Sequence, residues 1–312
     1  MSKHTQKMIA SVLAFSLSAS SVIFANAAEP TIQPDIGELE FEIKTTEWIT
    51  LDGITDAAIL FDFETGTILD VHDSITCANI PDTINGVSVN SIYNTAFKGC
   101  TKLVSVDIPN SVTEIGAGAF SGCSELKEIN IPESVTEIGA GAFSGCSSLV
   151  EVIIPPSVVE IGAGAFYDCS NLAKINIPNT ITAIGAATFI YCHNLQTIDI
   201  PNSVTEIAAA AFNGCNNLVS VNIPNSVTEI GSAAFNGCSS LQEVVIPSSV
   251  IEIGSAAFMY CSALSSIEIP SSITKIQSST FKGCTSLTKV VIPDSIKEIA
   301  ESAFKDCANL VL

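Results

Sequence analysis

Residues 126–148 read LKEINIPESVTEIGAGAFSGCSS, and this stretch decides the fold. At its start, Leu126, Ile129 and Ile131 have the spacing of a short strand with one side turned inward. Pro132 follows them, and because proline cannot donate a hydrogen bond to a neighbouring strand, it ends the strand. The beginning of the stretch therefore predicts a short β-strand with one buried side.

The rest of the stretch predicts a second short strand and a tight turn. Residues 134–139 (SVTEIG) form another β-like segment, which Gly139 closes. Residues 142–146 (AFSGC) are typical of a helical or 3₁₀ turn whose Ala142, Phe143 and Cys146 face the interior. The chain then reaches Leu149, where the next strand begins.

The same pattern returns with a period of 23 along most of the chain. A fixed period between about 20 and 29 residues with recurrent Leu positions is the signature of a leucine-rich repeat. One such coil cannot bury its own apolar face, so neighbouring coils must stack and share a continuous core. The positions in register are Phe97, Phe120, Phe143, Phe166, Phe189, Phe212, Phe235, Phe258, Phe281 and Phe304; the Cys three residues after each Phe, from Cys100 to Cys307; and a Pro in each step from Pro109 to Pro293.

The repeat resembles the BspA-like, or Treponema-type, leucine-rich repeat over about residues 75–312. Residues 111–123 and 134–146 match that pattern almost letter for letter, with Pro, Gly, Ala-Phe and Cys all in register. The resemblance implies an α/β repeat solenoid: a right-handed coil of about ten 23-residue repeats, with a parallel strand face, short helical turns and an N-terminal β cap. It also implies a secreted or cell-surface bacterial protein that acts in adhesion or host interaction.

The chain is expected to have three parts. Residues 1–27 are predicted to be a signal peptide, because Lys3 and Lys7 precede an apolar run that ends in the small-x-small pattern of residues 25–27. A membrane-spanning anchor is the alternative for this run. Residues 28–80 are expected to form an acidic segment and a β cap, and residues 81–312 the solenoid. No second apolar run follows, so no membrane span is expected in the mature chain.

The cap prediction rests on the segment that lacks the repeat. Residues 58–63 and 67–71 flank the turn at Thr65-Gly66 and are typical of a strand–turn–strand unit. A further turn is predicted at Asn85-Gly86, within an insertion in the first coil. At the other end, residues 310–312 begin another strand, which would leave apolar core columns uncovered if nothing follows.

The charge of the chain restricts its partners. Without Lys3 and Lys7 the sequence holds 10 Lys and no Arg against 32 acidic residues, a formal charge of −22. A nucleic acid requires a basic face, so no nucleic-acid partner is expected. Catalysis is not expected either, because no nucleophile motif is present. Glu128 and Glu151 could imitate a glycosidase pair, but a smooth sheet offers no enclosed site for a substrate.

No cofactor or metal is expected. The ten Cys in register have the position of a buried ladder of reduced thiols, and some disulfide bridges are the alternative. They lack the Cys-x-x-Cys pairing of a zinc site. Asp62, Glu64, Asp70 and Asp73 are close in sequence and could hold calcium, but a solvated acidic face explains them without it.

The outward positions of the first strand are the predicted binding surface. Apolar residues there are informative because the repeat does not need them, although ordinary surface Val with high β propensity is the alternative explanation. Non-catalytic binding of a protein partner is the expected function; a glycan is possible, and stacking through an uncapped last coil is a structural alternative. The candidate residues are Asp107, Asn130, Ile153, Asn176, Asp199, Asn222, Val245, Glu268 and Val291.

Overall fold

The computed structural model describes residues 45–50 and 58–311. The chain divides into two units, Met1–Ile43 and Lys44–Leu312, and all described residues belong to the second. The predicted signal peptide and residues 28–44 and 51–57 of the predicted acidic segment therefore lie outside the described residues.

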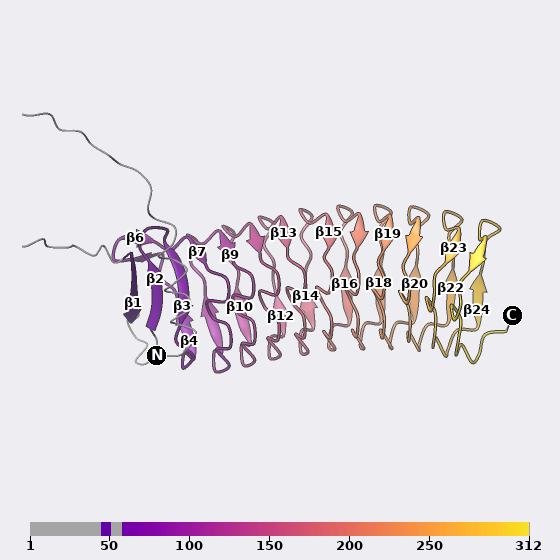
Figure 1. Cartoon of the computed structure of the whole chain (residues 1–312), viewed down its shortest axis with the longest axis horizontal. Coiled ribbons are helices and arrows are strands. Elements are labelled where there is room, and N and C mark those ends of the chain that lie inside the picture. The colour runs from indigo at the N-terminus through magenta and orange to yellow at the C-terminus, as the bar shows by residue number, and fades with distance from the viewer. Residues whose placement is uncertain (1–44, 51–57, 312) are drawn as a thin grey trace, which may run out of the picture. The chain divides into compact units, whose positions relative to one another are not determined.

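The second unit is a β-solenoid in which each coil has a first strand, a second strand and a turn (Figure 1). Strands of successive coils pair in parallel and in register, as Glu128 with Ser105 and Ile138 with Ile115, each pair one repeat apart in the sequence. The predicted 23-residue coil and its two strands are thereby confirmed. Each strand is only two or three residues long, and burial of one side fixes its register.

The first strands form one side of the solenoid, called the strand face below. They are β4 Cys77–Asn79, β8 Ser105–Asp107, β10 Glu128–Asn130, β12 Glu151–Val152, β14 Lys174–Ile175, β16 Thr197–Asp199, β18 Ser220–Asn222, β20 Glu243–Val245, β22 Ser266–Glu268 and β24 Lys289–Val291. The second strands form the second-strand face. They are β7 Ser91–Ile92, β9 Glu114–Ile115, β11 Glu137–Ile138, β13 Glu160–Ile161, β15 Ala183–Ile184, β17 Glu206–Ile207, β19 Glu229–Ile230, β21 Glu252–Ile253, β23 Lys275–Ile276 and β25 Glu298–Ile299.

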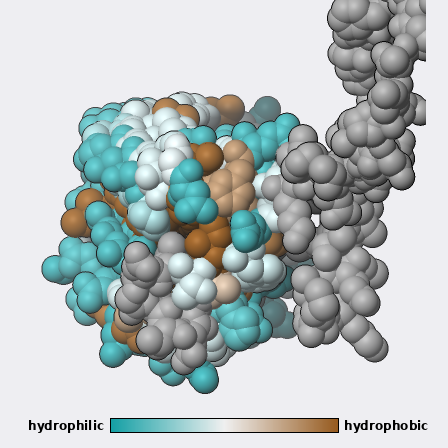
Figure 2. All heavy atoms as spheres, turned by 90° about the vertical axis from the view of Figure 1, so that its left-hand side faces the viewer, coloured by the Kyte–Doolittle hydropathy of each residue, from teal (hydrophilic) through white to brown (hydrophobic). Residues whose placement is uncertain are grey.

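Three antiparallel strands precede the coils: β1 Thr46–Thr50, β2 Ala58–Asp62 and β3 Thr67–Val71. The strand β3 pairs in parallel with β7, so these strands extend the sheet of the second-strand face. Figure 2 shows the surface at this end, where hydrophobic residues in the middle are surrounded by hydrophilic ones. Trp48 on β1 is 42% exposed there.

The insertion in the first coil is a small hairpin. Its strands are β5 Thr83–Ile84 and β6 Val87–Ser88, which pair antiparallel. Asn85 and Gly86 have φ of 48° and 83°, the left-handed geometry that a two-residue hairpin turn requires. The turn predicted at Asn85-Gly86 is confirmed.

A stack of phenylalanine rings runs through the core. The ten Phe of the repeat lie one above another, with ring centroids 4.8 to 5.8 Å apart and ring planes within 23° of parallel. Nine of these rings, from Phe97 to Phe281, are fully buried, beside columns of buried Leu, Ile, Val and Cys. The core is therefore the same layer repeated, and each layer is covered only by its two neighbours.

The cysteines beside this stack are free thiols with a defined hydrogen bond. All eleven Cys are free, and the nine from Cys100 to Cys284 are buried. The thiol of Cys146 donates to the carbonyl oxygen of Phe120 at 3.2 Å, and that oxygen also accepts the backbone N–H of Cys123 at 3.1 Å. The same bond recurs in each coil from Cys123 to Cys307. The column of reduced thiols is thus the arrangement the structure has.

Burial also keeps these thiols protonated. Desolvation raises the pKa of the Cys169 and Cys284 thiols from 9.0 to about 12, although the hydrogen bonds that they receive lower it in part. It raises the pKa of Cys238 and Cys261 well above 9.0 for the same reason. At neutral pH these cysteines act as small apolar side chains with a weak donor.

The predicted helical turns are wrong: the described residues contain no helix. Every second N–H of the turn donates to the next coil, as Phe120 N to Ala142 O and Gly122 N to Ser144 O, so it cannot donate within a helix. Gly118 and Gly122 also have φ of 61° and 77°, which breaks a right-handed helix twice. The turn is instead a series of single i to i−3 hydrogen bonds, such as Cys123 N to Phe120 O.

Candidate functional site

The nine candidate residues of the strand face form one column of exposed side chains. Where the strands pair, the column is in register, as Asn130 with Asp107 and Asn222 with Val245. All nine side chains are exposed. Ile153 and Val245 are each 68% exposed and Val291 is 40% exposed, so the column carries three of the exposed large apolar side chains of the described residues. The structure therefore brings the predicted residues together on one face.

One member of the column has a structural task. Asn176 Nδ2 donates to Ile154 O at 2.8 Å, and Asn176 Oδ1 accepts from Ile154 N at 2.7 Å. The side-chain amide thus takes the place of a strand partner for the backbone of the previous coil. These bonds hold the Asn176 amide against its own protein, so it is less free to bind a partner than its neighbours.

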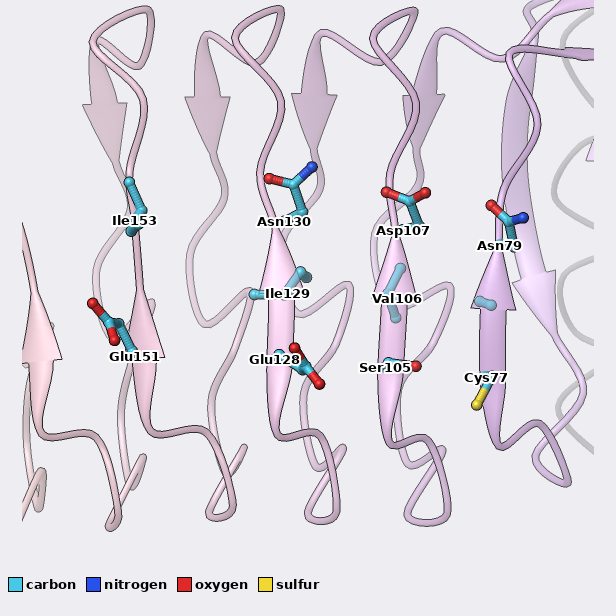
Figure 3. Close-up of a pocket in the computed structure, with 11 residues that line it drawn as sticks. Cys77, Asn79, Ser105, Val106, Asp107, Glu128, Ile129, Asn130, Glu151 and Ile153 are labelled. Carbon is cyan, nitrogen blue, oxygen red and sulfur yellow. The ribbon is translucent and has the colours of Figure 1, made fainter.

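A hollow of about 360 Å³ lies at the beginning of the strand face, over β4, β8, β10 and β12 (Figure 3). Two rows of side chains point into it from successive strands. One row is Cys77, Ser105, Glu128 and Glu151, and the other is Asn79, Asp107, Asn130 and Ile153. Its lining is acidic and amide-rich, with one exposed isoleucine at the edge.

A second hollow, of about 520 Å³, lies near the other end of the strand face. Val245 and Glu268 line it, together with Glu243 and Ser266 of the same two strands. Both hollows therefore combine exposed carboxylates with one large apolar side chain.

The sequence reasoning missed two groups of residues. Cys77 and Asn79 also line the first hollow. They lie on β4, which precedes the first complete repeat, so the repeat pattern did not include them. On the second-strand face, Val159 and Ile251 are 60% and 68% exposed, as much as the candidates of the strand face. The signal for the latter was present, since both replace the Thr that most coils have before the Glu of the second strand.

The tyrosines of the turn lie outside both faces. Tyr191 contacts Tyr167 edge-on, with ring centroids 5.8 Å apart, and His193 at 5.7 Å. Tyr191 also covers Gly214 of the next coil, since a Cβ on that glycine would lie 2.5 Å from Tyr191 Cδ1. Tyr260 covers Gly283 in the same way. Each of these tyrosines nevertheless remains between 38% and 48% exposed.

The acidic residues near the start of the solenoid make a local turn. The carboxylate of Asp62 accepts the N–H of Glu64 at 2.9 Å and the hydroxyl of Thr65 at 3.0 Å.

Glu151, on the strand face, lies 4.0 Å from the ammonium of Lys174, and both side chains are mostly exposed. Within residues 45–50 and 58–311, no three His, Cys, Asp or Glu side chains are grouped to hold a metal ion.

The repeat matches a family model along almost its whole length. The model is described as the BspA type leucine rich repeat region, and it matches residues 73–196 and 182–311. The chain belongs to the BspA type leucine-rich repeat family. The resemblance seen in the sequence is therefore confirmed. A search of curated proteins finds no match.

Three solved structures resemble this BspA-type chain along most of its length. A leucine-rich repeat protein from Bacteroides ovatus is 28% identical, with a TM-score of 0.59 over 87% of this chain and 81% of that protein. The T. pallidum leucine-rich repeat protein is 27% identical, with a TM-score of 0.53 over 71% and 89%. A leucine-rich cell surface protein from Faecalibacterium prausnitzii is 28% identical, with a TM-score of 0.50 over 91% and 88%.

No helix with the length and apolarity of a membrane span occurs among the residues that the structure describes.

Proposed function

We propose that this BspA-type protein is a non-catalytic binding protein that acts outside the cell and holds a protein partner on its strand face. The observation that carries the proposal is the exposure of Ile153 and Val245, each at 68%, beside the two hollows of that face. Protein interfaces combine apolar side chains with polar groups around them, and both hollows offer this combination. The cell-surface protein from F. prausnitzii supports an extracellular location.

The chemistry around these residues describes the partner further. Asp107, Glu128 and Glu151 share the first hollow with Ile153, and Glu243 and Glu268 share the second with Val245. A partner with apolar side chains flanked by Lys or Arg would bury the former and pair with the carboxylates. The carboxylates would then raise the association rate and favour basic partners, and the apolar contacts would slow dissociation.

The experiment compares two sets of variants of the full chain. Ile153→Asp, Val245→Asp and Val291→Asp change the strand face, and Val159→Asp with Ile251→Asp changes equally exposed residues of the second-strand face. Proteins captured from host and envelope extracts would be purified and titrated against each variant. We expect the strand-face set to weaken binding at least about tenfold, because a charge replaces a buried contact, and the control set to leave it unchanged. Loss of binding in the control set alone would refute the choice of face.

The structural alternative, assembly through the last coil, has its own observation. Ile292 and Ile299 are 38% and 49% exposed, whereas the equivalent residues of earlier coils are buried. A second copy or a further coil would cover them. Sedimentation over a range of concentrations separates the two functions, because end-to-end assembly predicts growing polymers and a binding protein predicts a constant mass.

A further inference from the structure

The outer side of the turns forms a surface that neither strand face explains. It consists of the residues between each core Phe and the following Leu, and it is called the turn ridge. In most coils these residues are small or charged, as Ser144 and Gly145, or Lys282 and Gly283. In three coils the ridge carries tyrosine instead, at Tyr167, Tyr191 and Tyr260.

Two of these tyrosines stand in a conformation that disfavours them. Tyr191 and Tyr260 have φ of 60° and 59°, at a ridge position where six other coils have glycine and two have aspartate, with φ of 56° and 63°. A side chain in this left-handed region costs about 1–2 kcal/mol relative to a right-handed conformation. The coil imposes this conformation on whatever residue stands at the position, so the observation that bears on function is that two of these residues are half-exposed aromatics.

The two rings are equivalent platforms. Each covers the glycine of the next coil, Gly214 under Tyr191 and Gly283 under Tyr260, with ring atoms within 2.4 to 3.0 Å of where a Cβ would be. The two tyrosines are three coils apart, and each coil advances by 5.3 to 5.4 Å along the phenylalanine stack. Two coils lie between them, and both have glycine at this ridge position: Gly214, which Tyr191 covers, and Gly237.

The surface between the platforms is uncharged and rich in amides. Residues 189–195, 212–218, 235–241 and 258–264 contain no Asp, Glu, Lys or Arg, in a chain with a formal charge of −20. Asn194 and Asn217 of this surface continue a ladder of side-chain hydrogen bonds that begins at Asn171 in the preceding coil, at 3.2 and 3.4 Å. These amides are therefore held in place before any ligand arrives, which lowers the entropic cost of binding.

His193 is fixed beside the first platform. Its Nδ1 lies 2.9 Å from the carbonyl oxygen of Gly214 and 2.8 Å from Asn216 Oδ1. Both of these atoms are acceptors, so Nδ1 carries the proton and donates. The ring is thereby held against Tyr191, with centroids 5.7 Å apart.

We propose that the turn ridge from Tyr191 to Tyr260 binds a neutral polysaccharide. The sugar rings of such a chain present apolar C–H faces, which stack on tyrosine, and hydroxyl groups, which pair with asparagine amides and imidazole. Two platforms at the ends of an open, uncharged surface fit a polymer that runs along the ridge. A charged glycan or an acidic or basic peptide would find no counter-charge between them.

The test uses the full chain and a set of purified neutral polysaccharides: β-glucan, xylan, mannan and starch. Binding would be measured by retardation in gels that contain each polymer and then by calorimetry. Tyr191→Gly and Tyr260→Gly are the informative variants, because glycine is the residue of the repeat at this position and relieves the left-handed strain. Tyr93→Ala is the matched control, since Tyr93 is 44% exposed but lies in the first coil, away from this surface.

We expect at least one of these polymers to bind. Each Tyr→Gly change should weaken the affinity for that polymer about tenfold or more, as the loss of one stacked ring does. Tyr→Phe should preserve the affinity. Retardation that is the same in the Tyr191→Gly/Tyr260→Gly double variant would overturn the proposal. So would the absence of binding to all four polymers, or the finding that only an acidic glycan or a peptide binds. Thermal unfolding of each variant excludes loss of the fold as the cause.

Discussion

The inner and outer sides of one turn obey opposite rules. Phe212 and Cys215 point inward and are fully buried, whereas Asn213, between them, reaches the surface. Across the ten coils the inner positions are always Phe and Cys, but the position of Asn213 holds Lys98, Tyr167 or Met259 in other coils. The comparison teaches that the coil separates stability from recognition by side-chain direction, residue by residue, within a single turn.

The residues of the inner side cannot vary, because each layer of the core packs directly on the next layer. A Phe ring that stacks on identical rings at 5.3 Å on both sides leaves no space for a different shape. The thiol of each Cys also completes the hydrogen bonding of a Phe carbonyl in the previous coil. On the outer side the contacts between neighbouring coils differ from one coil to the next, as where Tyr191 covers Gly214, so the residues vary and keep an exposed part that a ligand can reach.

The largest expected effect on the inner side comes from high pH, which should lower the free energy of unfolding through the buried thiols. Below pH 9.0 the thiols are neutral in both the folded and the unfolded chain, so they do not affect the balance. Above it the unfolded chain loses these protons, while burial holds them in the folded chain up to about pH 12 at Cys169 and Cys284. The folded state then binds more protons, so the free energy of unfolding falls by up to about 1.4 kcal/mol per thiol and pH unit.

Nine such thiols act together, so we expect the solenoid to unfold within about one or two pH units above 9, since folded domains are stable by only about 5–15 kcal/mol. Circular dichroism during titration measures this. A variant with Cys215→Ala and Cys238→Ala should show a shallower fall of stability with pH. An identical slope in that variant would contradict the assignment to thiols. At pH 8 a thiol reagent should modify exposed Cys77 and leave the nine buried thiols intact.

A pair of neighbouring substitutions sharpens the same contrast. Phe212→Ala opens a cavity in the middle of the ring stack, and we expect a loss of about 3–5 kcal/mol in the free energy of unfolding. Asn213→Ala changes the outer side of the same turn and should alter it by less than about 0.5 kcal/mol. Urea denaturation of the two variants provides the comparison, and equal losses would show that the outer side also carries stability.

Much of this contrast could be predicted from the sequence. The period of 23 identified the Phe and Cys columns as core and the alternation around Ile129 identified the outward positions, because a repeat shows directly which residues must be alike. The column from Asp107 to Val291 is exposed as expected. The reason is that burial of one side of a strand fixes its register.

The true conformation of the turns, including the left-handed backbone of Tyr191, could not be predicted in this way. A sequence such as AFSGC is compatible with a helix until the hydrogen bonds to the next coil are known, and those depend on how coils stack. The left-handed φ of Tyr191 is likewise imposed by its neighbours, since tyrosine itself avoids that region. Asn176 was expected to face a partner, but its amide replaces a missing backbone pairing that no local pattern reveals.

The smallest expected effect concerns two left-handed positions of the turn, one on the ridge and one just before the core Phe. Gly237 and Ala233 lie in the same coil with φ of 75° and 55°. A Cβ on Gly237 would meet nothing closer than Gly214 Cα at 3.6 Å, so Gly237→Ala meets no steric clash and should cost only about 1 kcal/mol, from backbone strain. Ala233→Gly should relieve the strain and stabilise the fold. The gain in the free energy of unfolding should stay below about 1 kcal/mol, because glycine loses more entropy on folding.

Thermal unfolding resolves the sign of each change, and the sign is what matters. If Gly237→Ala destabilises while Ala233→Gly stabilises, the ridge conformation is set by the coil, and any side chain there is tolerated against its preference. Tyr191→Gly should then be close to neutral, since relief of strain offsets the lost contact with Gly214. A tyrosine that contributes nothing to stability in this conformation leaves its exposed ring to a ligand and not to the fold. A large destabilisation by Tyr191→Gly would instead assign that ring to the fold.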